Sequence, residues 1–162
     1  MSVLTRHQAP ALAPDIAPDI DIRPAPAAPA LPRLPALPTR ADYLRARRLA
    51  WTVRWGLVDQ MPPLRPSALL EQTRRLLQTW GWAQTGWVMG TDEGLCIAGG
   101  LHVLTTVGQA TSLQVSEAET YLQRAIGTAQ HYSHWNETAG RAWPEVSTAL
   151  TTASRTAWKE GR

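Results

Sequence analysis

Proline is distributed so unevenly along this 162-residue chain that it divides the sequence before any other feature is considered. Nine of the 13 prolines fall between Pro10 and Pro38, whereas all eight tryptophans and all three tyrosines come after residue 40. Proline lacks a backbone donor and interrupts both helices and central strands. A segment without aromatic side chains also buries too little apolar surface to offset the entropy of ordering it. We therefore expect residues 1–40 to form a disordered leader.

The leader contains a tandem repeat, in which Ala-Pro-Asp-Ile occupies residues 13–16 and again 17–20. One interpretation is a spacer in the extended polyproline II conformation. The other is a docking peptide anchored by Ile16 and Ile20, because a preformed extended conformation lowers the entropy cost of binding.

Residues 41–66 are expected to form a second part, a basic helix over 41–59 followed by a proline-rich joint at Pro62 and Pro63. The helix carries cationic and aromatic side chains that could bind a partner: Arg45, Arg47, Arg48, Arg54, Trp51 and Trp55. Arginine with tryptophan suits contacts to phosphates and bases. The same pattern suits a helix that buries its tryptophans. The net charge of only +3 is modest for a nucleic-acid-binding protein.

Residues 67–162 are expected to form a helix-rich globular domain. Over 67–80 the apolar positions recur with helical spacing, and Ser67 is suited to cap that helix. Further helices are expected over 99–108, from Ser116, where Ser116 and Glu119 match a capping box, and from about Pro144. The predicted inner face of the last helix consists of Val146, Ala149, Leu150, Ala153 and Ala157.

A β-hairpin is predicted between the first two helices of this domain. Residues 87–89 (Trp-Val-Met) and 95–97 (Leu-Cys-Ile) flank a turn-rich loop at 90–94, a pattern typical of two short strands. The expected fold class is therefore α+β and predominantly α-helical, a small helical domain with one short hairpin and a disordered leader.

Cys96 is the only cysteine, which excludes an internal disulfide and a multi-cysteine zinc site. It precedes a glycine-led helix, a position that favours a reactive thiolate. With a histidine base such as His134, and Asn136 to orient that base, it could form a Cys-His-Asn catalytic arrangement. The alternative is an inert, buried cysteine between Leu95 and Ile97.

The histidines and glycines carry no specific ligand motif. His131 and His134 are three residues apart, but the sequence has no His-Glu-x-x-His pattern, and two imidazoles alone make a weak metal site. There is also no phosphate-binding glycine loop. We expect neither a metal nor a cofactor.

The longest uncharged stretch, residues 94–116, is interrupted by glycine, glutamine and threonine, which argues against a membrane span. No secretory signal is visible. A cytoplasmic protein without membrane contact is therefore expected.

Two stretches resemble an uncharacterised family of small proteins from actinobacteria and their phages: residues 95–101 (Leu-Cys-Ile-Ala-Gly-Gly-Leu) and residues 135–146, which hold Trp-Asn-Glu, Gly-Arg and Pro-Glu-Val. The resemblance covers about residues 67–158. It departs from the family pattern at Gly100, Glu137 and Ala142, where the family has Ala, Asp and Thr. It marks Trp135, Asn136 and Arg141 as motif residues and implies no reaction.

The function expected from the sequence is a non-enzymatic protein-interaction or regulatory module of phage or mobile-element origin. Its leader or its basic helix would bind a protein partner. Two alternatives stay open. One is nucleic-acid binding through the helix at 41–59, and the other is a cysteine-dependent hydrolase centred on Cys96.

Overall fold

The computed structural model describes residues 34–49, 62–85 and 94–162, all within a unit that starts at Pro32. In these residues the chain forms helices and no strand. The helices are α1 (Arg40–Arg48), α3 (Pro66–Trp80), α4 (Ile97–Thr106), α5 (Ser112–Ile126), α6 (Tyr132–Glu137) and α7 (Trp143–Lys159). None of them is long and apolar enough to cross a membrane.

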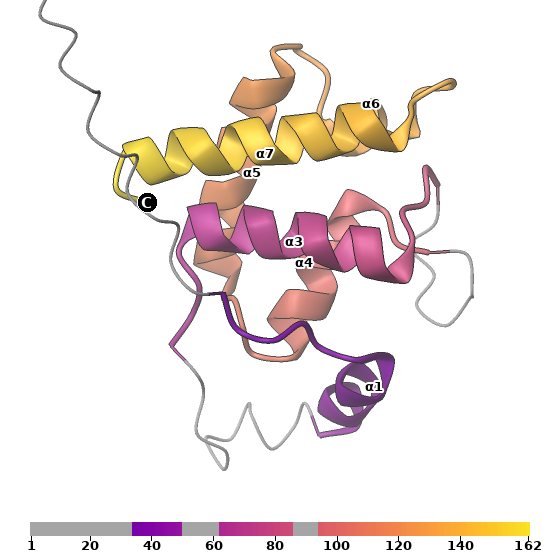
Figure 1. Ribbon diagram of the computed structural model, residues 1–162, viewed down its shortest axis with the longest axis vertical. Helices are drawn as coiled ribbons and strands as arrows, with labels where there is room; N and C mark the ends of the chain where they lie inside the picture. The colour runs from indigo at the N-terminus through magenta and orange to yellow at the C-terminus, as the bar shows by residue number, and fades with distance from the viewer. Residues whose placement is uncertain (1–33, 50–61, 86–93) are drawn as a thin grey trace, which may run out of the picture. The chain divides into compact units, whose positions relative to one another are not determined.

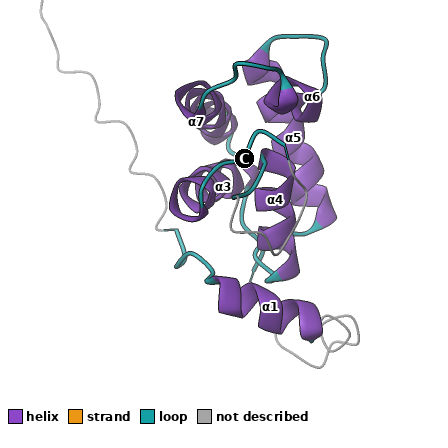
Figure 2. Cartoon of the chain, turned by 90° about the vertical axis from the view of Figure 1, so that its right-hand side faces the viewer, coloured by secondary structure: helices purple, strands orange, loops and turns teal. Residues whose placement is uncertain are grey.

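The helices of this unit are arranged in two layers. The first layer consists of α3 and α7, which lie side by side and run in opposite directions (Figure 1). The second consists of α4 and α5, which run across the first layer. Figure 2 shows α3 and α7 nearly end on, and α4 and α5 along their length. Between the layers lies a core of leucines, valines and alanines from all four helices. The short helix α6 packs on α4 and α5, and α1 packs on α4.

Helix α3 supplies the largest share of the core because its leucines recur on one face. Leu69, Leu70, Leu76 and Leu77 are completely buried, as the helical spacing predicts. The helix begins one residue earlier than expected, with Arg65 as N-cap and a proline in the first turn, since proline suits that position. Ser67, the predicted N-cap, lies inside the helix, where its carbonyl accepts a hydrogen bond of 2.9 Å from the Ser154 hydroxyl of α7.

The predicted inner face of α7 is confirmed, since all five of its residues are buried. Three of the five are alanines: Ala149, Ala153 and Ala157. Small side chains let two helix backbones approach closely, which fits the extensive contact between α7 and both α3 and α5. The helix starts at Trp143, with Pro144 in its first turn, one residue from the expected start.

The predicted β-hairpin is wrong, and with it the α+β class. In the described residues its place is taken by a single bridge between Trp82 and Leu95. The Leu95 N–H donates to the Gly81 carbonyl (2.9 Å), and the Ala83 N–H donates to the Leu95 carbonyl (3.0 Å). Strand pairing cannot continue past Leu95, because Cys96 is already the N-cap of α4 and Ile97 is its first residue. Residues 87–89, the other expected strand, lie outside the described part of the chain.

Two glycines make this bridge possible. Gly81 and Gly94 both adopt a positive φ, of 91° and 93°, which side chains other than hydrogen disfavour. A Cβ atom on Gly94 would lie 2.6 Å from the Gly81 carbonyl oxygen. The backbone at Gly94 therefore packs directly against the backbone at Gly81, with no room for a side chain between them.

Helix α5 begins four residues before the predicted start at Ser116. A capping box does open it, but the box is formed by Thr111 and Gln114, and the Thr111 N–H donates to the Gln114 side-chain oxygen (3.2 Å). Ser116 and Glu119 match the same sequence pattern one turn later and lie inside the helix. The helix ends at Gly127, whose φ of 68° is left-handed. Helix α4 is likewise displaced and spans 97–106, where 99–108 is predicted.

Helix α1 forms at the start of the predicted basic helix, and residues 50–61 lie outside the described part. A capping box of Thr39 and Asp42 opens it. Hydrogen bonds from the side chain and backbone of Thr39 lower the pKa of Asp42 below its ordinary value. Tyr43 is the residue that α1 buries, so the helix rests on the domain along a narrow line.

Candidate functional site

The described contacts of Cys96, His134 and Asn136 do not join them into the predicted Cys-His-Asn arrangement. Cys96 is half-buried, and its sulfur accepts a hydrogen bond from the Gly99 N–H (3.3 Å) as the N-cap of α4. His134 is exposed on α6. Among the described residues no hydrogen bond joins Cys96 to His134 or to Asn136. The thiol therefore has a structural partner here, and the catalytic arrangement stays a prediction.

Asn136 is 1% exposed, and its amide is fully used in holding the chain together. Its side-chain oxygen accepts a hydrogen bond from the Trp82 indole N–H (2.9 Å). Its nitrogen donates to the carbonyls of Gln84 (2.8 Å) and Ala83 (3.4 Å). Asn136 thus attaches residues 82–84, which follow α3, to helix α6. Both hydrogens of its amide are used, so none is left to orient an imidazole.

The other two motif residues join α6 to α7. The Arg141 guanidinium lies 4.0 Å from the centre of the Trp135 ring, and its Nε donates to the Trp135 carbonyl (3.2 Å). One terminal nitrogen also pairs with Glu145 in the first turn of α7 (2.6 Å). The stretch that the sequence marks as most distinctive therefore explains how α6 is anchored, and its polar groups are already satisfied.

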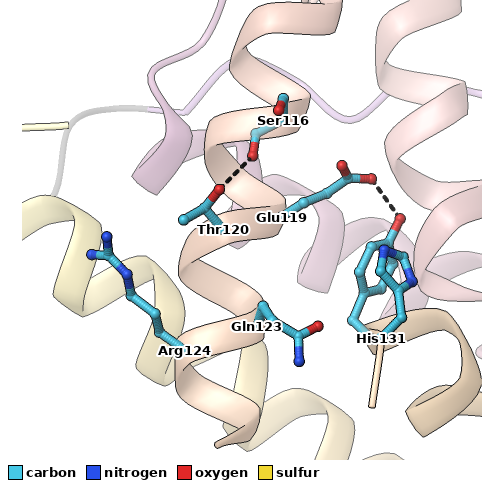
Figure 3. Close-up of a pocket in the computed structure, with 7 residues that line it drawn as sticks. Ser116, Glu119, Thr120, Gln123, Arg124 and His131 are labelled. Carbon is cyan, nitrogen blue, oxygen red and sulfur yellow. Dashed lines mark hydrogen bonds between the residues drawn. The ribbon is translucent and has the colours of Figure 1, made fainter. Parts of the chain in front are cut away.

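Cys96 lies beside a pair that the sequence analysis did not identify. The Tyr132 hydroxyl donates a hydrogen bond of 2.6 Å to the Glu119 carboxylate, across an open polar hollow of about 450 Å³ between α5 and the start of α6 (Figure 3). Burial raises the pKa of Tyr132 far above its usual range, and the hydrogen bond to Glu119 and the charges of Glu119 and Cys96 add to the rise. The phenol therefore stays protonated and serves as a donor. The sequence could indicate this pair only in general terms, since any buried tyrosine needs a partner for its hydroxyl.

The other charged groups of this hollow are paired within the chain. Arg124 contacts Glu160 (3.7 Å) and stacks on Tyr121. The His131 ring lies 2.9 Å from the Ser133 hydroxyl and caps α6, and the described residues contain no group of three side chains able to hold a metal ion. The Tyr132–Glu119 bond joins α6 to α5, and we propose no reaction for this hollow.

A second surface, on α1, differs from this hollow because it exposes two large apolar side chains. Leu44 and Leu49 are 47% and 43% exposed. They border a shallow depression of about 400 Å³, whose lining consists of Ala41, Leu44, Arg45, Arg48 and Leu49. Four of these residues, Ala41, Leu44, Arg45 and Arg48, lie three or four positions apart on one side of the helix, and the C-cap residue Leu49 borders the same depression. We call these five residues the α1 face.

Only part of the predicted partner-binding set can be placed. Arg45 and Arg48 belong to the α1 face, and Arg47 is exposed next to it. The remaining predicted residues lie outside the described part of the chain: Ile16, Ile20, Trp51, Arg54 and Trp55. Of the described arginines, Arg45 pairs with Asp42 at 3.7 Å, an exposed contact of a kind that contributes little to stability.

Comparison with known proteins identifies a family and no function. A family model matches residues 61–156, and its description is a family of unknown function (DUF6197). Neither the curated proteins nor the solved structures contain a significant match. The prediction of an uncharacterised family over part of the chain is confirmed, with bounds close to those expected. The matched residues hold the motif that anchors α6, and they exclude α1.

Proposed function

Starting from a chain that belongs to the DUF6197 family of unknown function, we propose that it is a non-enzymatic protein-interaction module. In this proposal the α1 face binds an amphipathic segment of a protein partner that combines apolar with acidic side chains. The observation that supports it most directly is the pair of exposed leucines, Leu44 and Leu49, set among arginines on one side of a helix.

The exposure of these leucines is unusual within the described domain. Single exposed apolar side chains are common on protein surfaces, but a contiguous apolar patch with a polar rim is typical of an interaction site. The other strongly exposed leucine among the described residues, Leu113, lies on α5 and lines none of the described hollows. The α1 face therefore differs from ordinary surface exposure in having two leucines around one depression.

Charge indicates the chemistry of the partner. Helix α1 carries four arginines against one aspartate. Arginines in the last turn also interact favourably with the negative end of the helix dipole, so helix stability explains part of this pattern. The remaining consequence is a positive potential around apolar side chains, which steers an acidic partner and disfavours a basic one.

The helix is also held in place before any partner binds. Its N-terminus is closed by the Thr39–Asp42 capping box, Tyr43 is buried, and the Arg40 guanidinium lies 5.6 Å from the centre of the Trp80 ring. A preformed surface loses less entropy on binding than a mobile one. These contacts support a role for α1 as a fixed docking helix.

The test uses the full chain and a fluorescein-labelled synthetic amphipathic helix with leucines on one face and glutamates beside them. Fluorescence anisotropy should show saturable binding. We expect Leu44→Ser with Leu49→Ser to weaken it by about tenfold or more, since apolar anchors carry most of the energy of such contacts. Leu113→Ser, an equally polar change at an exposed leucine, serves as the control and should leave binding unchanged.

Charge is tested with a matched pair of arginines from the same helical turn. Arg48→Glu, within the α1 face, should weaken binding more than Arg47→Glu, outside it. A peptide with lysines in place of the glutamates should not bind. Equal binding of both peptides would contradict the proposal. A shift of a DNA duplex at low salt, lost in Arg45→Glu with Arg48→Glu and without any binding of the acidic peptide, would favour the nucleic-acid alternative.

A further inference from the structure

The residues just before α1 are held by a pair of buried glutamines. Residues 34–38, Leu-Pro-Ala-Leu-Pro, have no regular secondary structure, and we call them the proline strap. The Gln72 side-chain nitrogen donates to the carbonyls of Pro35 (3.1 Å) and Ala36 (3.4 Å). The Gln109 side-chain nitrogen donates to the same Ala36 carbonyl (3.3 Å). A side chain from α3 and one from the connection between α4 and α5 thus converge on two adjacent backbone carbonyls.

This arrangement is built into the domain. Gln72 is 0% and Gln109 is 5% exposed, and the two amides also contact each other (3.4 Å). The oxygen of Gln72 accepts a hydrogen bond from Arg75 (3.0 Å), which orients its nitrogen towards the strap. The backbone carbonyl of Gln109 accepts from the Leu64 N–H (2.8 Å). The two donors are therefore fixed in position by neighbours on both sides.

The chemistry of the donors matches the needs of an extended proline-containing segment. Such a segment forms no internal hydrogen bonds, and its prolines have no N–H to pair with a strand. Its carbonyls must therefore find donors elsewhere, and side-chain amides supply them without requiring a donor in return. An apolar contribution comes from Pro38, which is buried, and from Leu37, which packs against the core.

The family match includes the two glutamines but not the strap that they bind. Gln72 and Gln109 lie within the matched residues 61–156, whereas the strap lies before them. We propose that Gln72 and Gln109 form a peptide-binding site of the family domain for extended, proline-containing segments, and that the strap is a ligand which fills it within the same chain. This inference is independent of the α1 face, which involves other residues.

The site selects its ligand mainly through the backbone. Both glutamines donate their hydrogen bonds to main-chain carbonyls of the strap. The selective features are the extended conformation, which proline preforms at low entropy cost, and an apolar residue followed by proline at the positions of Leu37 and Pro38. A partner with such a segment must compete with the strap, which is tethered and therefore present at an effective concentration in the millimolar range.

The test replaces the strap in the full chain with a glycine/serine sequence of equal length and adds a fluorescein-labelled peptide of residues 34–40 (Leu-Pro-Ala-Leu-Pro-Thr-Arg). The replaced chain should bind the peptide saturably, and the natural chain should bind it about tenfold or more weakly, because its site is filled. Adding Gln72→Ala to the replaced chain should reduce binding by about tenfold. Gln78→Ala, at an exposed glutamine of the same helix, is the matched control and should have no effect.

A second peptide tests whether the carbonyl itself is recognised. An ester in place of the amide between Ala36 and Leu37 makes the Ala36 carbonyl a weaker acceptor and leaves every side chain in place. We expect this peptide to bind several-fold more weakly than the amide.

Three outcomes would overturn the proposal. The replaced chain could keep its helicity, by circular dichroism, and bind no peptide up to about 1 mM, the concentration that a short tether supplies. Gln78→Ala could weaken binding as much as Gln72→Ala. If the replaced chain loses its helicity, Ala36→Gly with Leu37→Gly, which keeps Pro38 and the α1 cap, takes its place. Loss of helicity in that variant as well would show that the strap is part of the core and not a ligand.

Discussion

The indole N–H of Trp82 donates a hydrogen bond of 2.9 Å to the side-chain oxygen of Asn136, a residue 54 positions further along the chain. The same asparagine donates to the carbonyls of Ala83 and Gln84. One buried side chain therefore satisfies three groups of the segment that follows α3. This relationship makes Asn136 a residue of the fold and gives the first prediction.

Asn136→Ala should lower the free energy of unfolding by about 3 kcal/mol, because it leaves an indole N–H and two carbonyls without partners in a partly buried place. Asn136→Asp should do no better, since its carboxylate accepts from Trp82 but repels both carbonyls. Urea denaturation measures the change. His134→Ala, at an exposed position of the same helix, is the control, and a loss at Asn136 no larger than that of the control would contradict the assignment.

Arg141→Lys should destabilise the protein by about 1 kcal/mol although it keeps the charge. Lysine can still pair with Glu145, but it lacks the planar guanidinium that covers the Trp135 ring and the Nε that donates to the Trp135 carbonyl. Glu145→Gln removes only the ion pair and should cost less than about 0.5 kcal/mol, since Glu145 is half exposed. Thermal unfolding of both variants separates the contributions. A larger loss for Glu145→Gln than for Arg141→Lys would show that the ion pair is the main contact.

Gly100 of α4 packs closely against Thr73 and Leu77 of α3. A Cβ atom at this position would lie 3.1 Å from the Thr73 Cγ2 and 3.2 Å from the Leu77 Cδ2, and both neighbours are completely buried. Gly100→Ala should therefore cost about 1 kcal/mol net, because crowding in the core outweighs the better helix propensity of alanine.

The sharper test of this contact is a rescue. Thr73→Ser removes the crowded methyl group and keeps the hydroxyl that donates to the Leu69 carbonyl (2.8 Å). In the Thr73→Ser background, Gly100→Ala should be close to neutral or stabilising. Equal costs in both backgrounds, measured by urea denaturation, would rule out the methyl as the cause.

Because of Tyr132, we expect the free energy of unfolding to fall at alkaline pH. Burial, with the hydrogen bond to Glu119, raises the pKa of Tyr132 above its ordinary value of 10.0. Above that pH the unfolded phenol loses its proton while the folded one keeps it, so the folded state binds more protons. The contribution of this group is complete below about pH 10 and falls as the pH rises further, by up to about 1.4 kcal/mol per pH unit.

Tyr132→Phe should remove that part of the alkaline slope while lowering stability at neutral pH, where it breaks the bond to Glu119. The free energy of unfolding, measured in urea from about pH 8 to about pH 11, tests both effects. Tyr43→Phe, which removes a different phenol oxygen, is the control. An unchanged slope in Tyr132→Phe would contradict the assignment.

Cys96 should be replaceable by serine. Its sulfur accepts from the Gly99 N–H, and a serine hydroxyl is a better N-cap. Cys96→Ser should therefore be as stable as the natural protein or more so, whereas Cys96→Ala should lose about 1 kcal/mol. Circular dichroism melting curves distinguish the two. Equal destabilisation by both would indicate a role for the sulfur that capping does not explain.

The helices with a continuous apolar face could be predicted from the sequence, because burial decides their placement. The leucines of α3 and the inner face of α7 are where helical spacing puts them. The start of α5 could not be predicted, because Thr111–Gln114 and Ser116–Glu119 match the same capping pattern, and the pattern does not say which one opens the helix. The hairpin prediction failed for a related reason: Leu95-Cys96-Ile97 is as apolar as a strand, but Cys96 caps a helix.

The candidate sites depend on contacts that sequence spacing does not encode. Nothing in the order of residues places Tyr132 beside Glu119, or the carbonyls of residues 35 and 36 beside Gln72 and Gln109. The sequence did mark Asn136 and Arg141 as distinctive, but their role in holding α6 became clear only from their partners. The basic character of α1 was predictable, and the exposure of its leucines was not.

The antiparallel pairing of α3 with α7 has a consequence for biosynthesis. The two helices that share the core most extensively are far apart in the chain, and contacts of that kind form late in folding. During translation the leucine face of α3 emerges well before the alanines that cover it. In a ribosome-bound chain, α4 and α5 can cover part of that face, but the part that α7 covers stays exposed until α7 is complete, and in that interval the chain is a natural client for a holdase chaperone.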